Sequence, residues 1–206
     1  YVATAGQGLL PASCEAGARR YFDIRARRSA QSLDDVYDEC KEQVATLLGV
    51  SADTIAFTGS TSDGINSVYA CIDWRPGDNV IIVDEALEFP SVVAPARALE
   101  GSGVEVRQVL ANRMVGSAQT VSPADVAAAV DSHTRLVIVS HVSYKTGFRF
   151  DLAEVSAKVR AAGNAWFAVD ASQSLGVVPV DAQACDFVVS TGFKWTLGAH
   201  GAAIFF

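Results

Sequence analysis

The chain has 206 residues, half of them hydrophobic, and a formal net charge of −7. This length and composition suit one globular domain with a sizeable core, and they exclude a disordered protein. The acidic balance argues against a nucleic-acid partner, because no basic cluster offsets it; the densest basic run, residues 25–28, is interpreted as a solvated surface.

Neither a membrane span nor a secretion signal is expected. No apolar run approaches about 18 residues, and the opening "YVATAGQGLLPAS" lacks the charged-then-apolar layout of a signal peptide. The four cysteines are widely spaced and form no CxxC pair, which predicts no metal site and no disulfide framework and favours a cytoplasmic protein. Cys71 and Cys185 lie in apolar stretches and are expected in the core.

Two helices are predicted within residues 12–48, so that a helical segment covers about residues 1–50. The second, "LDDVYDECKEQVATLLG", is strongly amphipathic and ends at Gly49. Further along the chain, Ser122 followed by Pro123 predicts a helix start. Asp151 with Glu154 resembles a capping box and predicts a helix that ends near residue 163.

Short β-branched runs alternate with these helical segments from residue 55 onward. Several of the runs are continuously apolar, which is typical of strands covered on both faces. We therefore predict an α/β fold of three layers around a mostly parallel, seven-stranded sheet. The predicted strands are residues 55–58, 80–83, 104–109, 136–140, 166–170, 187–190 and 202–206.

Polar residues follow these strands where each one leaves the sheet, and in open parallel sheets this edge binds ligands. The residues are Thr58, Asp84 with Glu85, Ser140 with His141, Asp170, and Ser190 with Thr191. Capping and loop polarity could explain any one of them, but five together indicate a binding site.

Three features near these strand ends suggest particular chemistry, and each also has a purely structural explanation. "GSTSDGIN" offers Thr61, Ser62 and a helix start to a phosphate, although a plain N-cap turn has the same residues. Asp170 is either a helix cap or the counter-charge of a buried cation. Lys194, between Phe193 and Trp195, is either a snorkelling surface lysine or a desolvated Schiff-base nucleophile.

Five motifs together resemble the large domain of the fold-type I enzymes that use pyridoxal 5′-phosphate (PLP). The motifs are "GSTSDGIN", "EFPS", "SHVSYKTG", "VDASQSLG" and "STGFKWTLGAHG". The chain is most similar to the class V aminotransferases, which include cysteine desulfurases, kynureninase and isopenicillin-N-epimerase-like proteins. The resemblance runs from "YVATAGQGLLP" to "GAAIFF". A nucleotide-binding Rossmann domain is disfavoured, because no GxGxxG follows the first strand.

The resemblance implies a role for each matching residue. Lys194 is expected to hold PLP as an internal aldimine, to release it when the substrate forms an external aldimine, and then to act as the base at the α-carbon. Asp170 is expected to bind the pyridine nitrogen, Gln173 the phenolic oxygen, and the ring of Phe89 to stack on the cofactor.

The phosphate end is expected to be bound by Thr61 and Ser62, joined by Thr191. Two positions depart from the desulfurase pattern, because Phe193 replaces a histidine and Tyr144 replaces an asparagine. Tyr144 is also expected to contact the cofactor. These choices favour the epimerase-like or a lyase-like branch and leave epimerisation, β-elimination or desulfuration, and transamination open.

Members of this family are about twice as long, and their second half supplies the arginine that binds the substrate carboxylate. The resemblance therefore implies an amino-acid substrate and a homodimer, or a hetero-oligomer with a chain that supplies the C-terminal half. The sequence is expected to be either a truncated protein or one half of a split enzyme. The alternative is a non-catalytic or incomplete subunit that needs a second polypeptide.

Overall fold

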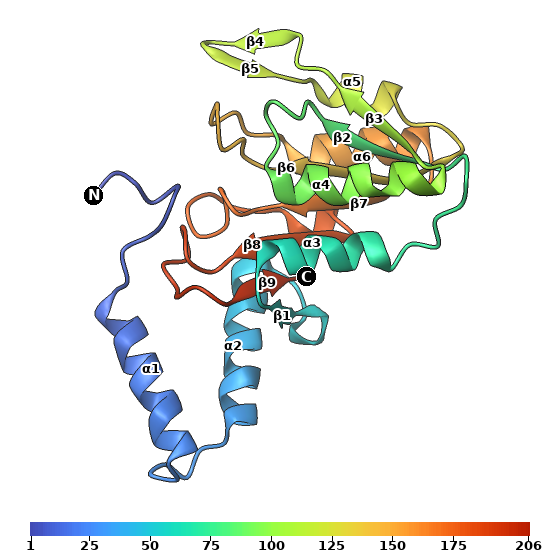
Figure 1. Ribbon diagram of the computed structural model, residues 1–206. Coiled ribbons are helices and arrows are strands. Elements are labelled where there is room, and N and C mark those ends of the chain that lie inside the picture. The colour runs from blue at the N-terminus through green and yellow to red at the C-terminus, as the bar shows by residue number, and fades with distance from the viewer.

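The computed structural model describes residues 1–206 and is organised around one seven-stranded sheet (Figure 1). The strands follow the order β1-β9-β8-β7-β6-β2-β3, and only β9 runs antiparallel to its neighbours. The predicted fold class is thus confirmed, and each predicted strand overlaps an observed one. The strands are β1 (Ala56–Thr58), β2 (Asn79–Val83), β3 (Glu105–Val109), β6 (Thr134–Ser140), β7 (Trp166–Asp170), β8 (Phe187–Thr191) and β9 (Ala203–Phe205).

Helices cover both faces of this sheet, which explains why the central strands are apolar without alternation (Figure 1). One core cluster joins α3 and α4 to Val80 and Ile82 of β2, and the other joins α2, α5 and α6 to Ile81 and Val83. Successive residues of one strand therefore face opposite layers. The helices are α1 (Ala12–Arg25), α2 (Leu33–Leu48), α3 (Thr61–Ala70), α4 (Pro90–Ala98), α5 (Pro123–Ala128) and α6 (Leu152–Ala162).

The predicted helix ends are largely confirmed. Gly49 ends α2 in the left-handed conformation, with φ of 67°, and Ser122 begins α5 in a full capping box. The box predicted at Asp151 is only half formed. Its carboxylate accepts the amide of Glu154 at 3.1 Å, but Glu154 turns toward Lys158 instead of returning the contact.

Two features differ from the sequence prediction. Cys185 is buried as expected, but the expectation for Cys71 is wrong, because this residue follows α3 on the exposed side. A two-stranded hairpin, β4 (Arg113–Val115) with β5 (Ala118–Thr120), was not predicted. Its strands have three residues each and lie outside the main sheet, so they bury too little apolar surface to leave a pattern.

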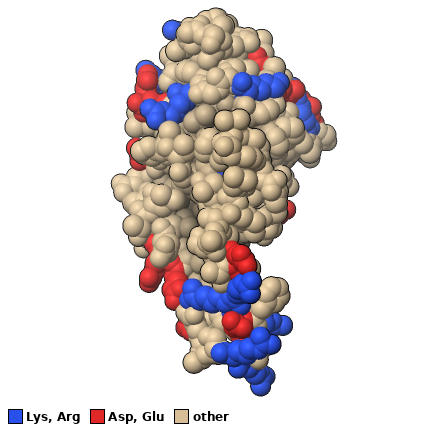
Figure 2. All heavy atoms as spheres, turned by 90° about the vertical axis from the view of Figure 1, so that its left-hand side faces the viewer, with Lys and Arg blue, Asp and Glu red and all other residues tan.

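Charged side chains gather at the end of the molecule formed by α1 and α2, where Figure 2 shows basic and acidic residues interspersed. Residues 25–28 lie exposed there, as expected. Ion pairs join Arg19 to Glu15, Arg20 to Glu39 and Arg28 to Asp23. No helix has both the length and the apolar character needed to cross a membrane.

The N-terminal segment contacts the loop that follows β8. The amide of Gly8 donates to the carbonyl of Phe193 at 2.8 Å, and the thiol of Cys14 lies 3.2 Å from the carbonyl oxygen of Leu197. Gly8 is buried in an otherwise exposed stretch, and a β-carbon there would lie 2.3 Å from the carbonyl oxygen of Lys194. Only glycine permits this approach.

Gly8→Ala should therefore detach the N-terminal segment from this loop, since the methyl group collides with backbone that cannot move aside. We expect a loss of about 1–3 kcal/mol in the free energy of unfolding and faster hydrogen exchange in residues 5–10 and 193–198. Gly17→Ala is the matched control, because no atom lies within 4 Å of the added methyl group. Unchanged exchange in Gly8→Ala would contradict the docking.

Candidate active site

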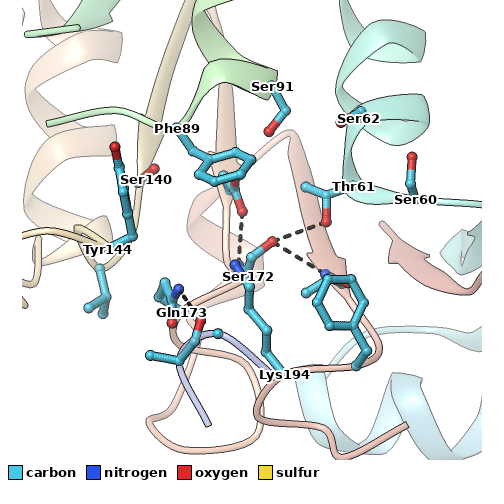
Figure 3. A pocket seen from close by; sticks show the side chains of 16 residues that line it. Ser60, Thr61, Ser62, Phe89, Ser91, Ser140, Tyr144, Ser172, Gln173 and Lys194 are labelled. Atoms are coloured by element: carbon cyan, nitrogen blue, oxygen red, sulfur yellow. Dashed lines mark hydrogen bonds between the residues drawn. The ribbon is translucent and has the colours of Figure 1, made fainter. Parts of the chain in front are cut away.

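A cavity of about 480 Å³ opens at the carboxyl ends of β6, β7 and β8, facing the first turns of α3 and α4 (Figure 3). All eight residues predicted for the site line it. Of the residues noted at the strand ends, Ser140, Asp170 and Thr191 also line it, whereas Thr58, Asp84, Glu85, His141 and Ser190 do not. The eight predicted residues are Thr61, Ser62, Phe89, Tyr144, Asp170, Gln173, Thr191 and Lys194.

Two opposite charges, Asp170 and Lys194, share this cavity. Asp170 ends β7 and is 5% exposed, so burial raises the pKa of its carboxyl, while hydrogen bonds from Ser172 and the charge of Lys194 oppose this rise. Burial lowers the pKa of the Lys194 ammonium, and Asp170 opposes that shift in turn. The lysine is thus brought toward its neutral, nucleophilic form beside a buried acid.

The aromatic ring that covers Lys194 is that of Phe89, whose centroid lies 5.3 Å from Nζ. The neighbours of Lys194 in sequence have other contacts. Phe193 lines the cavity but stacks on His200 at 4.0 Å, and Trp195 lies outside the lining. Phe89 in turn meets the ring of Tyr144 edge-on at 5.5 Å, so two aromatic rings line one side of the cavity.

Gln173 has a fixed amide orientation. Its Oε1 accepts the indole N–H of Trp195 at 2.9 Å, and its Nε2 donates to the carbonyl of Ala5 at 2.8 Å. A primary amide has two N–H donors, so one remains for a ligand oxygen. The N-terminal segment thus holds a predicted site residue in place and adds Ala5 and Gly6 to the lining.

The opposite end of the cavity is rich in hydroxyl groups and backbone donors. The amides of Thr61 and Ser62 begin α3 and have no acceptor within the helix. The buried hydroxyls of Thr191 and Ser91 have no hydrogen-bond partner. Orphaned donors beside a helix N-terminus suit a phosphate, which accepts several hydrogen bonds and favours the positive end of the helix dipole.

The residues present therefore fit PLP. A buried acid can pair with the ring nitrogen, a desolvated lysine can bind the aldehyde carbon, Phe89 can cover the ring, and unsatisfied hydroxyl groups can take up the phosphate. Asp170 and Lys194 are the only charged residues in the lining. The cavity therefore offers no second cation to a substrate carboxylate.

Sequence reasoning missed several lining residues, namely Ala5, Gly6, Ser60, Ser91, Val142 and Ser172. Ser91 and Ser172 stand inside motifs that the sequence did single out, "EFPS" and "VDASQSLG". The sequence alone does not mark such a serine as a binding residue, because helix caps and turns also use serine.

Comparison with known proteins agrees with this geometry. The family model "Aminotransferase class-V" matches residues 22–206. A "Probable cysteine desulfurase" of Methanothermobacter thermautotrophicus is 36% identical over 185 residues, which are 89% of this chain and 43% of that protein. A kynureninase of Pseudomonas fluorescens is 28% identical over 188 residues, 88% of this chain and 43% of that protein. The chain thus spans less than half the length of these relatives.

Solved structures with the same fold include the cystine C–S lyase C-DES in complex with its reaction product cysteine persulfide. It is 26% identical and superimposes with a TM-score of 0.87 over 98% of this chain and 55% of that chain. A mutant of C-DES that holds glycine covalently linked to its PLP cofactor is 25% identical, with a TM-score of 0.85 over the same shares of the two chains.

A second buried acid, Glu88, lies directly behind the cavity and was not predicted. It is 3% exposed, and its carboxylate accepts the amide of Ser140 at 2.9 Å as well as the hydroxyl of the same residue. Burial raises the pKa of Glu88 to about 7, against the opposing effect of the Ser140 hydrogen bonds, and the charge of Asp170 adds to the rise. Glu88 thereby ties the end of β6 to the loop before α4.

Glu88→Gln should change how stability depends on pH. Between pH 4.5 and about 7 the unfolded chain loses this proton while the folded chain keeps it, so the free energy of unfolding falls as pH rises. The amide of glutamine can keep both contacts with Ser140 but cannot ionise. The free energy of unfolding of the variant, relative to that of the wild type, should therefore increase by up to about 3 kcal/mol between pH 4.5 and 8.

Urea unfolding of the PLP-free protein at pH 5 and pH 8 measures this change. Burial lowers the pKa of His141 to about 4, which gives both proteins an opposite slope in acid, and this slope cancels in the difference between them. A difference between variant and wild type that is the same at both pH values would contradict the ionisation of Glu88.

Proposed function

The chain belongs to the class V aminotransferase family, and we propose that it forms the PLP site of an enzyme that acts at the α-carbon of an amino acid. The observation that carries this proposal is the presence of Asp170, Lys194 and the unpartnered hydroxyl of Thr191 in one cavity. When bound, PLP supplies an electrophilic carbon and a ring that withdraws electrons from the substrate.

Different residues of the cavity would bind different parts of PLP. Asp170 would pair with the ring nitrogen and keep it protonated, and the free N–H of Gln173 would donate to the phenolic oxygen. Phe89 would cover the ring and exclude water from that face. Thr61, with Ser62 and Thr191, would bind the phosphate through hydroxyl groups and the amides of the first turn of α3.

Lys194 would both hold the cofactor and move the proton of the reaction. Its burial favours the neutral amine, which can bind a carbonyl carbon and later accept a proton at Nζ. The nearby charge of Asp170 limits this shift, so the lysine can be protonated again. The ring of Phe89 lies 5.3 Å from this nitrogen and covers it on one side.

For the reaction itself we propose the lyase-like or epimerase-like branch of the family. Tyr144 and Phe193 stand where a desulfurase is expected to carry asparagine and histidine, and both line the cavity. The relative named above as a probable cysteine desulfurase and the cystine C–S lyase among the structures are named for amino-acid substrates, which supports a substrate of this class.

A second proposal concerns the rest of the site. Because Asp170 and Lys194 are the only charged lining residues, the group that binds the substrate carboxylate would come from outside this copy of residues 1–206. It would belong to a further part of the same polypeptide, to a second copy in a homodimer, or to a separate chain. Intact mass together with light scattering of the purified protein separates these cases, and turnover by a monomer of residues 1–206 would contradict all of them.

Addition of PLP to the purified protein should produce an absorption band near the visible edge, and Lys194→Ala should abolish it. Borohydride reduction should then leave the mass of the cofactor on the peptide that contains Lys194. Lys145→Ala is the matched control, since this lysine lies exposed against Tyr144 and does not line the cavity. Cofactor found on other lysines alone would refute the assignment.

A further inference from the structure

Ser172 connects the two ends of the cavity, a role that neither its sequence nor the family resemblance assigned to it. It is 7% exposed and follows Asp170 by two residues. Its amide donates to Oδ1 of Asp170 at 2.8 Å. Its Oγ lies 3.1 Å from Oγ1 of Thr61 and accepts the amide of Thr191 at 3.3 Å, as the dashed lines of Figure 3 show.

We propose that Ser172 is a positioning residue that fixes the ring-binding carboxylate of Asp170 relative to the phosphate-binding residues Thr61 and Thr191. The inference rests on the proposed PLP site. PLP is a rigid ring with a phosphate on a short arm, so both ends bind well only when their protein groups lie at the right separation. Ser172 is the one residue that is hydrogen-bonded to both groups.

The hydroxyl groups of Ser172 and Thr61 share one hydrogen bond, in which either oxygen can be the donor. The hydroxyl oxygen of Ser172 also accepts the amide of Thr191. When Ser172 donates to Oγ1 of Thr61, the Thr61 proton is free for an anion in the cavity. The hydroxyl of Thr191 has no partner in the protein and is a second donor free for the same anion.

A serine nearby shows what a purely local contact looks like. Ser174 is fully buried, and its hydroxyl donates to the carbonyl of Ala171 at 3.1 Å, three residues before it. It does not line the cavity. The partners of the Ser172 hydroxyl, by contrast, come from α3 and β8, which are 111 and 19 residues away in sequence.

Ser172→Ala isolates the hydroxyl, because the backbone contact with Asp170 does not depend on the side chain. In the apo form of the purified protein, the dissociation constant of PLP should rise about five- to tenfold, as expected for one or two hydrogen bonds. Pyridoxal has the same ring and aldehyde but no phosphate, and its dissociation constant should change less than twofold. Ser172→Thr keeps a hydroxyl and should restore most of the affinity for PLP.

Ser174→Ala is the matched control, and it should leave the ratio of the two dissociation constants unchanged. A double-mutant cycle adds a test that does not depend on one variant. Thr61→Val removes the partner hydroxyl at nearly constant volume. The two losses of PLP affinity should be less than additive, because either single variant already breaks the contact between the two hydroxyl groups.

Three results would overturn the proposal: unchanged PLP affinity in Ser172→Ala, an equal loss for PLP and pyridoxal together with a lower melting temperature, or fully additive losses in the cycle. The second result would indicate a merely structural serine. If the wild type binds neither PLP nor pyridoxal, the proposed function fails instead, so the two failures are distinguishable.

Discussion

The site depends on one electrostatic constraint, the burial of Asp170 and Lys194 against the same cavity. Burial disfavours the charged form of each, and each charge offsets part of the other's penalty. The arrangement requires β7 and β8 to be adjacent and parallel, and they pair with Asp170 opposite Val189, which brings the loop of Lys194 beside the end of β7.

The layered fold makes this burial possible. The central strands β2, β6, β7 and β8 have apolar residues on both faces and keep water out of the middle of the sheet, so their polar side chains lie near the strand ends. At that edge the first turns of α3 and α4 add unpaired donors and the ring of Phe89. The acid, the lysine, the aromatic ring and the hydroxyl groups thus come from different elements, and the sheet brings them together.

The sequence was sufficient for the parts of the structure that repeat a physical pattern. Short β-branched runs, several of them continuously apolar, predicted all seven strands, and capping residues such as Ser122 predicted helix starts. Conspicuous residues, Lys194 above all, led to the cavity through their resemblance to a family. Glu88 could not be found in this way, because its burial depends on Ser140, which is 52 residues away in sequence. Ser172 was not predicted for the same reason, because the hydrogen-bond partners of its hydroxyl come close to it only in the folded chain.

In the proposed enzyme, cofactor binding and substrate binding would depend on different parts of the protein. The residues proposed to bind the ring and the phosphate, Asp170, Lys194 and the start of α3, all lie within these 206 residues. The substrate side has aromatic rings and no second cation. Affinity for the cofactor would therefore be a property of this chain alone, whereas the choice among the reactions open to its family would depend on the groups that meet the substrate carboxylate. Substitutions at Ser172 or Thr61 should then alter cofactor binding without changing which bond is broken.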